Sequence, residues 1–362
     1  MIKRNEGLDF LRGIAILLVL FRHLPVSLKF LPNFLFVVFI RIKSFGYIGV
    51  DLFFVLSGFL VSGLYFLKIN NDRPPEIKKF LTRRAFKIWP SYYLYVFIMM
   101  FFGFYTKSFE RNWASFSSAL FHIQNYYLTD KLHLWSLAIE EHFYTLLSFI
   151  VFLMAKKNLK NFKKNIIVVI SLCSLLPFLM RLIFTNHHSY MTHMRADGLF
   201  VGVLISAIFH FYHEYFVSLR KYQLPMLCLS FILFIPTFYY IDLANSGYWV
   251  RSFGFLMLHI GFGLLLICVL NSSDYVFRKC FNSLPGKFIQ QLGILSYGIY
   301  LWHFDYNGAF HGLISKFNLS ERNFFVGISL FSVYLFSIYL LGLISMNLIE
   351  KPFLKLRDRY FK

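Results

Sequence analysis

Apolar runs of about 20 residues, each long enough to cross the hydrocarbon core of a bilayer, recur along the whole chain. They predict ten membrane-spanning helices, near residues 8–25, 46–67, 88–105, 134–155, 165–184, 195–215, 223–241, 249–270, 288–310 and 324–347. Residues 31–40 are too short to cross and predict an interfacial or re-entrant piece. Of the 362 residues 58% are hydrophobic, more than a soluble protein of this length can bury. We therefore expect an all-α, polytopic integral membrane protein with one membrane-embedded domain over residues 1–362 and no appended soluble domain.

The positive charge of the chain has a topological explanation. The net charge is +20, and most lysines and arginines lie in short loops between the apolar runs. If both termini are cytoplasmic, 24 basic residues fall on the cytoplasmic side and 10 on the other, while three lie within spans. This bias is the one that fixes membrane orientation. It favours ten spans with both termini inside, and a membrane-lipid environment over a nucleic-acid partner.

The sequence does not predict a metal or disulfide site. The four cysteines form no CxxC pair and no Cys/His ligand spacing. His187, His188 and His193 resemble metal ligands, but no carboxylate pattern accompanies them. We expect no bound metal.

The first span contains charged residues, which are costly inside a membrane and by default serve a function. Its stretch LDFLRGIAILLVLFRH carries Arg12, Arg22 and His23. Arg12 and His23 are eleven residues apart, so they share a helix face within about 20° and stand roughly 16 Å apart along the axis. Arg22 points about 100° away and is placed to reach the outer headgroups.

Four other spans bring polar residues to the same depth as His23. With the expected topology they lie in the outer half of the membrane. These residues are Asp51 in the second span, Glu140 and Glu141 in the fourth, Arg195 and Asp197 in the sixth, and Tyr300, His303 and Asp305 in the ninth, while Ser57 of the second span lies nearer the middle. If the spans are neighbours, this layer is a buried polar site.

Each of these residues also has a structural interpretation. His303 fits a hydrogen-bonded packing residue equally well, and Arg195 with Asp197 fits a structural pair. Glu140 and Glu141 cannot share a helix face, so one is expected to face the site while the other pairs elsewhere.

The segment NNDRPPEIKKFLTRRAFKIWP is the one stretch that suggests an extramembrane element. Its paired prolines predict the start of a short basic helix on the cytoplasmic surface. By sequence alone Arg83, Arg84 and Lys87 fit a topology anchor better than a ligand site.

Several blocks resemble the membrane-bound acyltransferase family 3, whose members are similar to bacterial O-antigen and exopolysaccharide O-acetyltransferases. An arginine followed by a histidine eleven positions later, in RGIAILLVLFRH, resembles the signature of that family. The other blocks follow in family order and cover essentially the whole chain: GVDLFFVLSGFL, RRAFKIWP, LWSLAIEEHFY, RADGLFVGVLIS, LGILSYGIYLWH and EKPF. Lys87 stands where an arginine is common, which weakens a two-pronged phosphate contact there.

The resemblance implies a reaction and roles for these residues. The donor would be cytoplasmic acetyl-CoA, and the acceptor a hydroxyl of a cell-surface or lipid-linked glycan, such as lipopolysaccharide O-antigen or an exopolysaccharide, outside a bacterial inner membrane. Arg12 would hold the CoA phosphates with Arg83, Arg84 and Lys87. His23 would act as base or as acetyl carrier, and both routes stay open. Glu140 or Glu141 would orient its ring, with Glu141 weakly favoured. Asp51 belongs with the catalytic residues, and the acceptor-binding set is Ser57, Arg195, Asp197, Tyr300 and His303.

Two other function classes fit the buried charges. A transporter would use them as a proton or substrate path, although the chain shows no internal repeat. A non-catalytic assembly partner for glycan export would not respond to acetyl-CoA. The ordered blocks favour the enzyme.

Overall fold

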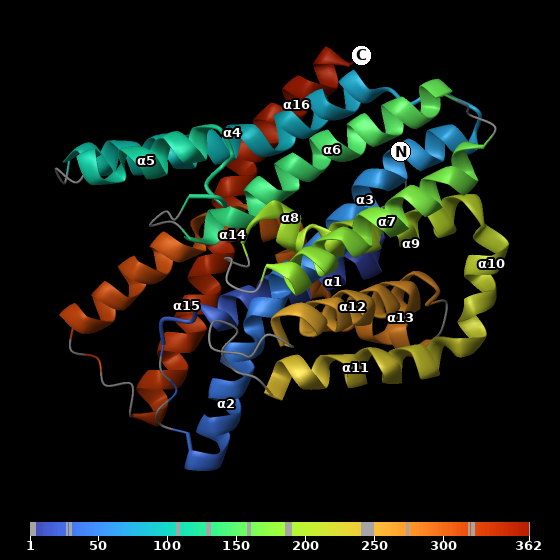
Figure 1. Cartoon of the computed structure of the whole chain (residues 1–362). Coiled ribbons are helices and arrows are strands. Elements are labelled where there is room, and N and C mark those ends of the chain that lie inside the picture. The colour runs from blue at the N-terminus through green and yellow to red at the C-terminus, as the bar shows by residue number, and fades with distance from the viewer. Residues whose placement is uncertain are drawn as a thin grey trace. The chain divides into compact units, whose positions relative to one another are not determined.

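The computed structural model shows an all-helical protein (Figure 1). It describes residues 5–26, 28, 31–105, 109–127, 132–157, 161–184, 190–239, 250–272, 275–317, 319 and 323–361. Within these ranges the regular secondary structure is helical, and no strand occurs. The all-α expectation is confirmed.

The chain forms two compact units. The first unit comprises residues 1–50, 90–95 and 279–362, and the second comprises residues 51–89 and 96–278. The main helices of the first unit are α1 (Glu6–Arg22), α2 (Asn33–Phe45), α14 (Leu284–Lys316), α15 (Phe324–Ser345) and α16 (Lys351–Tyr360). The residues of the short helix α13 (Tyr275–Asn282) are divided between the two units after Arg278.

The second unit holds most of α3 (Gly49–Asn70) and most of α4 (Ile77–Tyr105). Residues 90–95 of α4 belong to the first unit. Its other helices are α5 (Phe109–Leu120), α6 (Trp135–Lys157), α7 (Phe162–Ile183), α8 (Thr192–Arg195), α9 (Asp197–Phe211), α10 (His213–Ser218), α11 (Gln223–Tyr239) and α12 (Phe255–Leu270). Shorter helical elements flank these helices. The 3-10 helices are η1 (Gly46–Ile48), which belongs to the first unit, η2 (Leu132–Leu134) and η3 (Leu219–Tyr222), and the π-helices are η4 (Val250–Gly254) and, in the first unit, η5 (Met346–Glu350).

Each of the ten expected spans falls on a helix, because a long apolar run is a local property of the sequence. Among the described residues, seven helical stretches are long and apolar enough to cross a membrane. They are Asn33–Asn70, Ile77–Phe102, Trp135–Lys156, Phe162–Ile183, His213–Tyr239, Val250–Leu270 and Phe324–Tyr360. Helices α1 and α9 have 17 and 15 residues and are shorter than this. The count of ten and the cytoplasmic termini stay predictions.

Two short pieces expected to be separate are parts of longer helices. Residues 33–45 form α2, which continues through η1 into α3 as one helical stretch of 38 residues. The basic segment after the paired prolines begins at Ile77 and continues through Pro90 to Tyr105 as the single helix α4. At the first junction Gly46 and Gly49 keep right-handed helical backbone angles, so neither glycine ends the helix.

Helices α1 and α14 form the tightest packing in the first unit. A Cβ atom at Gly293 would stand 1.9 Å from the Asp9 carbonyl oxygen, and one at Gly13 would stand 1.9 Å from that of Ile289. Small residues let membrane helices approach this closely. Contacts at Asp9–Gly293 and Arg12–Ser296 both lie 284 residues apart in sequence, so the two helices run parallel. The first and ninth of ten spans are expected to cross in the same direction.

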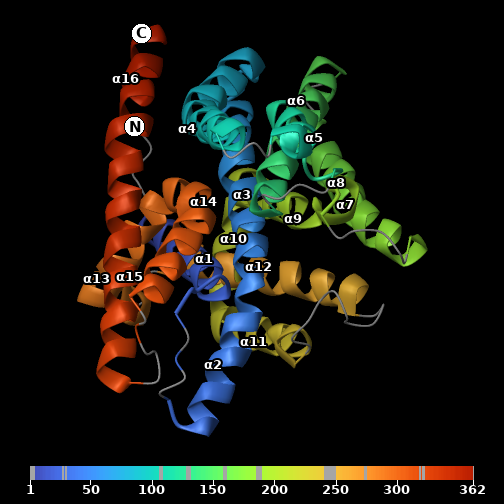
Figure 2. The ribbon, with the colours of Figure 1, turned by 90° about the vertical axis from the view of Figure 1, so that its left-hand side faces the viewer.

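Helix α15 packs on α14 in the opposite direction. The Tyr306 hydroxyl donates to Ser337, and a Cβ atom at Gly342 would stand 2.7 Å from the Ile299 side chain. Helix α15 then runs through η5 into α16, which Figure 2 shows as one long red helix.

The second unit is also built on close glycine contacts. A Cβ atom at Gly58 of α3 would stand 1.9 Å from the Leu199 carbonyl oxygen, and one at Gly202 of α9 would stand 2.1 Å from that of Val55. Helices α3 and α9 are therefore antiparallel and nearly in backbone contact. This packing places Asp51, at the start of α3, in the interior of the unit.

Candidate functional site

A polar stripe on α14 faces the two predicted functional residues of α1. The stripe consists of Ser296, Tyr300, His303 and Asn307, spaced four, three and four residues apart, which places all four on one helix face. Arg12 donates from Nη2 to the Ser296 hydroxyl at 3.0 Å. The shared face of Arg12 and His23 predicted from their spacing is confirmed, because both contact this stripe.

His23 lies directly after the last residue of α1, and two residues of α14 contact it. Its ring centroid is 5.3 Å from that of His303, with the ring planes inclined by 51°. The Asn307 amide donates to the His23 carbonyl oxygen at 2.8 Å. As a whole residue, His23 is exposed. The structure thus brings together His23, His303 and Tyr300 of the predicted site.

Hydrogen bonding fixes the tautomer of His303. Its Nδ1 lies 2.6 Å from the Tyr300 carbonyl oxygen, which can only accept, so Nδ1 carries the proton. His303 is fully buried, and Tyr300 is 7% exposed. The packing interpretation of His303 therefore fits its hydrogen bond and burial, while its contact with His23 keeps it beside the reactive position. Near it, Asp305 accepts a hydrogen bond from Tyr95.

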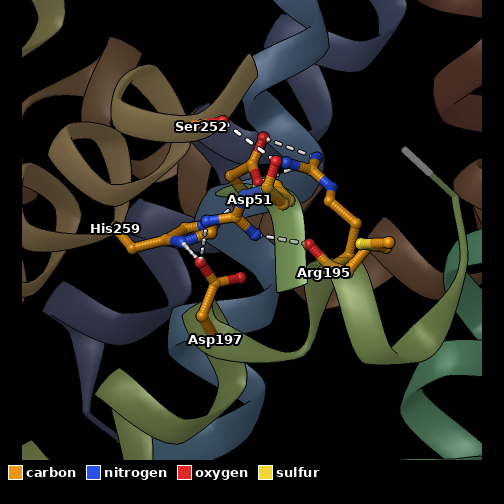
Figure 3. Close-up of polar contacts among 7 residues, drawn as sticks. Asp51, Arg195, Asp197, Ser252 and His259 are labelled. Carbon is orange, nitrogen blue, oxygen red and sulfur yellow. Dashed lines mark hydrogen bonds and ion pairs between the residues drawn. The ribbon is translucent and has the colours of Figure 1, made fainter. Parts of the chain in front are cut away.

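The second unit contains a buried cluster of charged residues from five helices (Figure 3). Asp51 of α3 pairs with Arg195 of α8 at 2.9 Å. Asp197 of α9 pairs with Arg181 of α7 at 2.6 Å. His259 of α12 joins the two pairs, with Nε2 at 2.9 Å from Asp51 and Nδ1 at 3.1 Å from Asp197. All five side chains are at most 5% exposed.

The geometry of His259 specifies its protonation. Carboxylates only accept hydrogen bonds, whereas a neutral imidazole has one donor and one acceptor nitrogen. Both nitrogens of His259 face a carboxylate oxygen, so a proton on each nitrogen avoids a repulsive lone-pair contact. As an imidazolium, His259 would connect α3 to α9, with a hydrogen bond to Asp51 of α3 and an ion pair with Asp197 of α9.

Arg195 and Asp197, two predicted substrate-binding residues, thus form ion pairs with other residues of the protein. The suggested Arg195–Asp197 pair is wrong, because each pairs with a different partner. The Arg195 guanidinium also lies 3.6 Å above the Phe255 ring centroid, a short cation–π contact. Arg181 donates to the Met194 carbonyl oxygen, and the Ser252 hydroxyl donates to the Arg181 carbonyl oxygen at 3.4 Å. The catalytic role of Asp51 and the binding roles of Arg195 and Asp197 stay predictions.

The adjacent carboxylates of α6 have different partners, as the angle between them requires. Glu140 accepts a hydrogen bond from Tyr144, whose hydroxyl lies 2.9 Å from that of Ser57. Glu141 accepts from the Trp89 indole at 3.3 Å. Glu140, Tyr144 and Ser57 therefore form one polar chain, and Glu141 belongs to another contact. Their partnership with His23 stays a prediction.

The basic residues of α4 differ in their surroundings. Arg84 is half-buried, with its guanidinium 5.4 Å above the Tyr144 ring centroid and 5.8 Å above that of Phe80. Arg83 is exposed, and Lys87 is half-buried. Binding of CoA phosphates by these residues stays a prediction.

The histidine-rich loop shows no metal-binding geometry among the residues that the structure describes. His187 and His188 lie outside them, and His193 bonds through Nδ1 with the Tyr126 hydroxyl at 3.2 Å. No group of three His, Cys, Asp or Glu side chains in the described ranges is arranged to hold a metal ion.

Sequence reasoning missed several residues at these positions. Arg181 and His259 lie in apolar helices, where any charge or imidazole signals a buried polar contact. Asn307 follows His303 by four residues, the spacing of neighbours on one helix face. Tyr334 of α15, whose hydroxyl donates to the Asn307 side-chain oxygen at 2.9 Å, gives no comparable signal, since a tyrosine in an apolar helix is common.

Comparisons with known proteins identify relatives of this chain. The Acyl_transf_3 family, described as an acyltransferase domain, matches residues 5–346. "Putative peptidoglycan O-acetyltransferase YrhL" of Bacillus subtilis is 28% identical over 82% of this chain and 48% of its own length. "Peptidoglycan O-acetyltransferase OatA" of Listeria monocytogenes is 26% identical over 83% of this chain and 49% of its own. The chain therefore spans about half the length of these curated relatives. No solved structure shows a significant match.

Proposed function

Because the chain belongs to acyltransferase family 3, we propose that it transfers an acetyl group from acetyl-CoA to a hydroxyl of a glycan. The family resemblance predicted from the sequence blocks is thereby confirmed. The printed names of the relatives refer to peptidoglycan, rather than to the O-antigen or exopolysaccharide expected from the sequence. Peptidoglycan is accordingly the first acceptor to test, in a multi-pass protein of the bacterial cytoplasmic membrane.

The observation that carries this proposal is the alignment of Arg12 and His23 along α14. Eleven residues of helix separate them by roughly 16 Å, a distance comparable to the pantetheine arm of CoA. In this proposal Arg12 binds a CoA phosphate, for which its planar guanidinium is suited. The thioester would then lie near the His23 imidazole.

His23 supplies the proton transfers of the reaction. A neutral imidazole accepts the proton of the acceptor hydroxyl while the hydroxyl oxygen bonds to the thioester carbonyl carbon. The carbon–sulfur bond then breaks, and the departing CoA thiolate takes the proton from the imidazolium. In the other route the unprotonated imidazole nitrogen attacks the thioester carbonyl carbon, the carbon–sulfur bond breaks, and CoA leaves as the thiol with the proton of the imidazole. The acceptor hydroxyl then attacks the acetyl carbon, the carbon–nitrogen bond breaks, and the hydroxyl proton returns to the imidazole. Glu140 or Glu141 would orient the ring in either route.

A radiolabelled acetyl-transfer assay tests this function. Purified protein in lipid vesicles would be given labelled acetyl-CoA and peptidoglycan fragments, and the label on the glycan would be counted. We expect His23→Ala to abolish transfer while inserting at normal abundance. His213→Ala, an exposed histidine of α10 in the second unit, is the matched control and keeps its activity.

Two results would contradict the proposal. Full transfer by His23→Ala would show that this imidazole is not the base or carrier. An active uptake of glycan precursors by the wild-type protein, without any acetyl transfer, would support the transporter instead.

A further inference from the structure

We propose that Asn307 and Tyr334 are positioning residues that hold His23 in place for acetyl transfer. The proposal rests on the proposed function, since it assigns these residues to the imidazole that the reaction uses. All three residues lie in the first unit, on α14, α15 and the end of α1.

A chain of two hydrogen bonds connects α15 to His23. The Tyr334 hydroxyl donates to the Asn307 side-chain oxygen at 2.9 Å. The Asn307 amide nitrogen donates to the His23 carbonyl oxygen at 2.8 Å. Tyr334 is fully buried and Asn307 is 8% exposed, so water does not compete strongly for these bonds.

The direction of both bonds follows from the chemistry of the groups. A backbone carbonyl only accepts, so the nitrogen of the Asn307 amide must face His23. Its oxygen then faces Tyr334, which must donate its hydroxyl hydrogen. The tyrosine therefore fixes the amide in the one orientation that can bind His23.

The hydrogen bond from Asn307 to His23 lies at the end of α1, where the hydrogen bonds within that helix stop. The His23 N–H still donates to the Val19 carbonyl at 3.2 Å, but the carbonyls of a last helical turn have no partner within their helix. The Asn307 amide supplies one for His23. Together with the His303 ring on the same face of α14, it fixes the backbone from which the imidazole projects.

Removing this support should lower turnover more than donor binding. A displacement of about 1 Å in a reacting group can cost about 100-fold in rate. We therefore expect Tyr334→Phe to lower kcat about 10-fold and Asn307→Leu about 100-fold. The apparent KM for acetyl-CoA should stay within about twofold, because Arg12 bonds to Ser296, which precedes Asn307 by eleven residues of α14.

Tyr306→Phe is the matched control. It also removes a tyrosine hydroxyl that bonds α14 to α15, through Ser337, but that bond does not lead to His23. We expect its kcat to match the wild type. Thermal stability of each purified variant would be measured beside its kinetics, and Asn307→Asp, which keeps the side-chain volume, serves if Asn307→Leu does not fold.

The outcomes separate this proposal from the proposed function. Wild-type kcat in Tyr334→Phe and the Asn307 variants, with His23→Ala inactive, would overturn the positioning role alone. An equal fall of kcat in Tyr306→Phe would also overturn it, because general loosening of α14 and α15 would explain the loss. Activity in His23→Ala would instead reject the role of His23 in the proposed function.

Discussion

Replacing Asp197 by asparagine tests how much the buried charged cluster stabilises the second unit. The change keeps the shape of the side chain and removes one negative charge. It leaves Arg181 without its anion and His259 without one of its two carboxylates. Removing one partner of a buried ion pair costs about 3–5 kcal/mol, because the other charge stays buried without compensation.

An exposed pair of equal length provides the comparison. Lys68 and Glu76 also lie 2.6 Å apart, but their side chains are 33% and 48% exposed. The hydrogen bond from Lys68 lowers the pKa of Glu76, followed by that from Lys79. Exposed pairs contribute about 0.2–1 kcal/mol, so Glu76→Gln should be nearly silent. The distance between the charged atoms alone therefore does not determine how much an ion pair contributes to the free energy of unfolding.

Thermal unfolding in detergent measures the difference in stability between the two variants. The readout is the fraction of protein that remains monodisperse after a fixed heating time. A loss of about 3–5 kcal/mol corresponds to roughly 6–20 °C for a unit of about 200 residues. We expect Asp197→Asn to show a fall in this range, and Glu76→Gln a fall of about 4 °C or less. Equal small shifts in the two variants would refute the reasoning that burial makes the cluster essential.

Three further changes have defined outcomes. Arg12→Lys should raise the apparent KM for acetyl-CoA in a steady-state assay, because lysine keeps the charge without the planar fork; an unchanged KM would make Arg12 structural. Gly293→Ala should lower the unfolding temperature, since its Cβ would stand 1.9 Å from the Asp9 carbonyl oxygen, whereas Gly308→Ala has open space and should not. Burial lowers the pKa of His122 to about 4, so its contribution to stability is present above about pH 6.5 and is lost as pH falls toward 4. His122→Asn, which tolerates the left-handed backbone at φ 55°, should lose less stability than the wild type between pH 7 and 4 in the same unfolding assay.

The helices and the alignment of Arg12 with His23 were predictable because both depend on local sequence. Apolar length determines which segments form membrane helices, and the helical repeat determines which residues share a face. The sequence did not predict in detail which residues of α14 contact the face of Arg12 and His23. Glycines at positions 13 and 293 gave no sign that α1 and α14 would meet at backbone distance.

The buried cluster shows where sequence reasoning ends. Asp51, Arg195 and Asp197 were recognised individually, but their partners depend on which helices are neighbours. Asp51 lies 144 residues from Arg195 and 208 residues from His259 in sequence. Such contacts follow from tertiary packing, which the pattern of any single helix does not contain.

The parallel pairing of α1 and α14 has a consequence for how the protein is made. Arg12 and its hydrogen-bond partner Ser296 are 284 residues apart, so α1 leaves the ribosome long before α14 exists. At about 5–20 residues per second, that interval is roughly 15–60 s. During this time the nascent α1 has none of the stripe on α14 to pair with its arginine. Assembly of the first unit is therefore completed only at the end of translation, and the helix synthesised first is among the last to complete its native contacts.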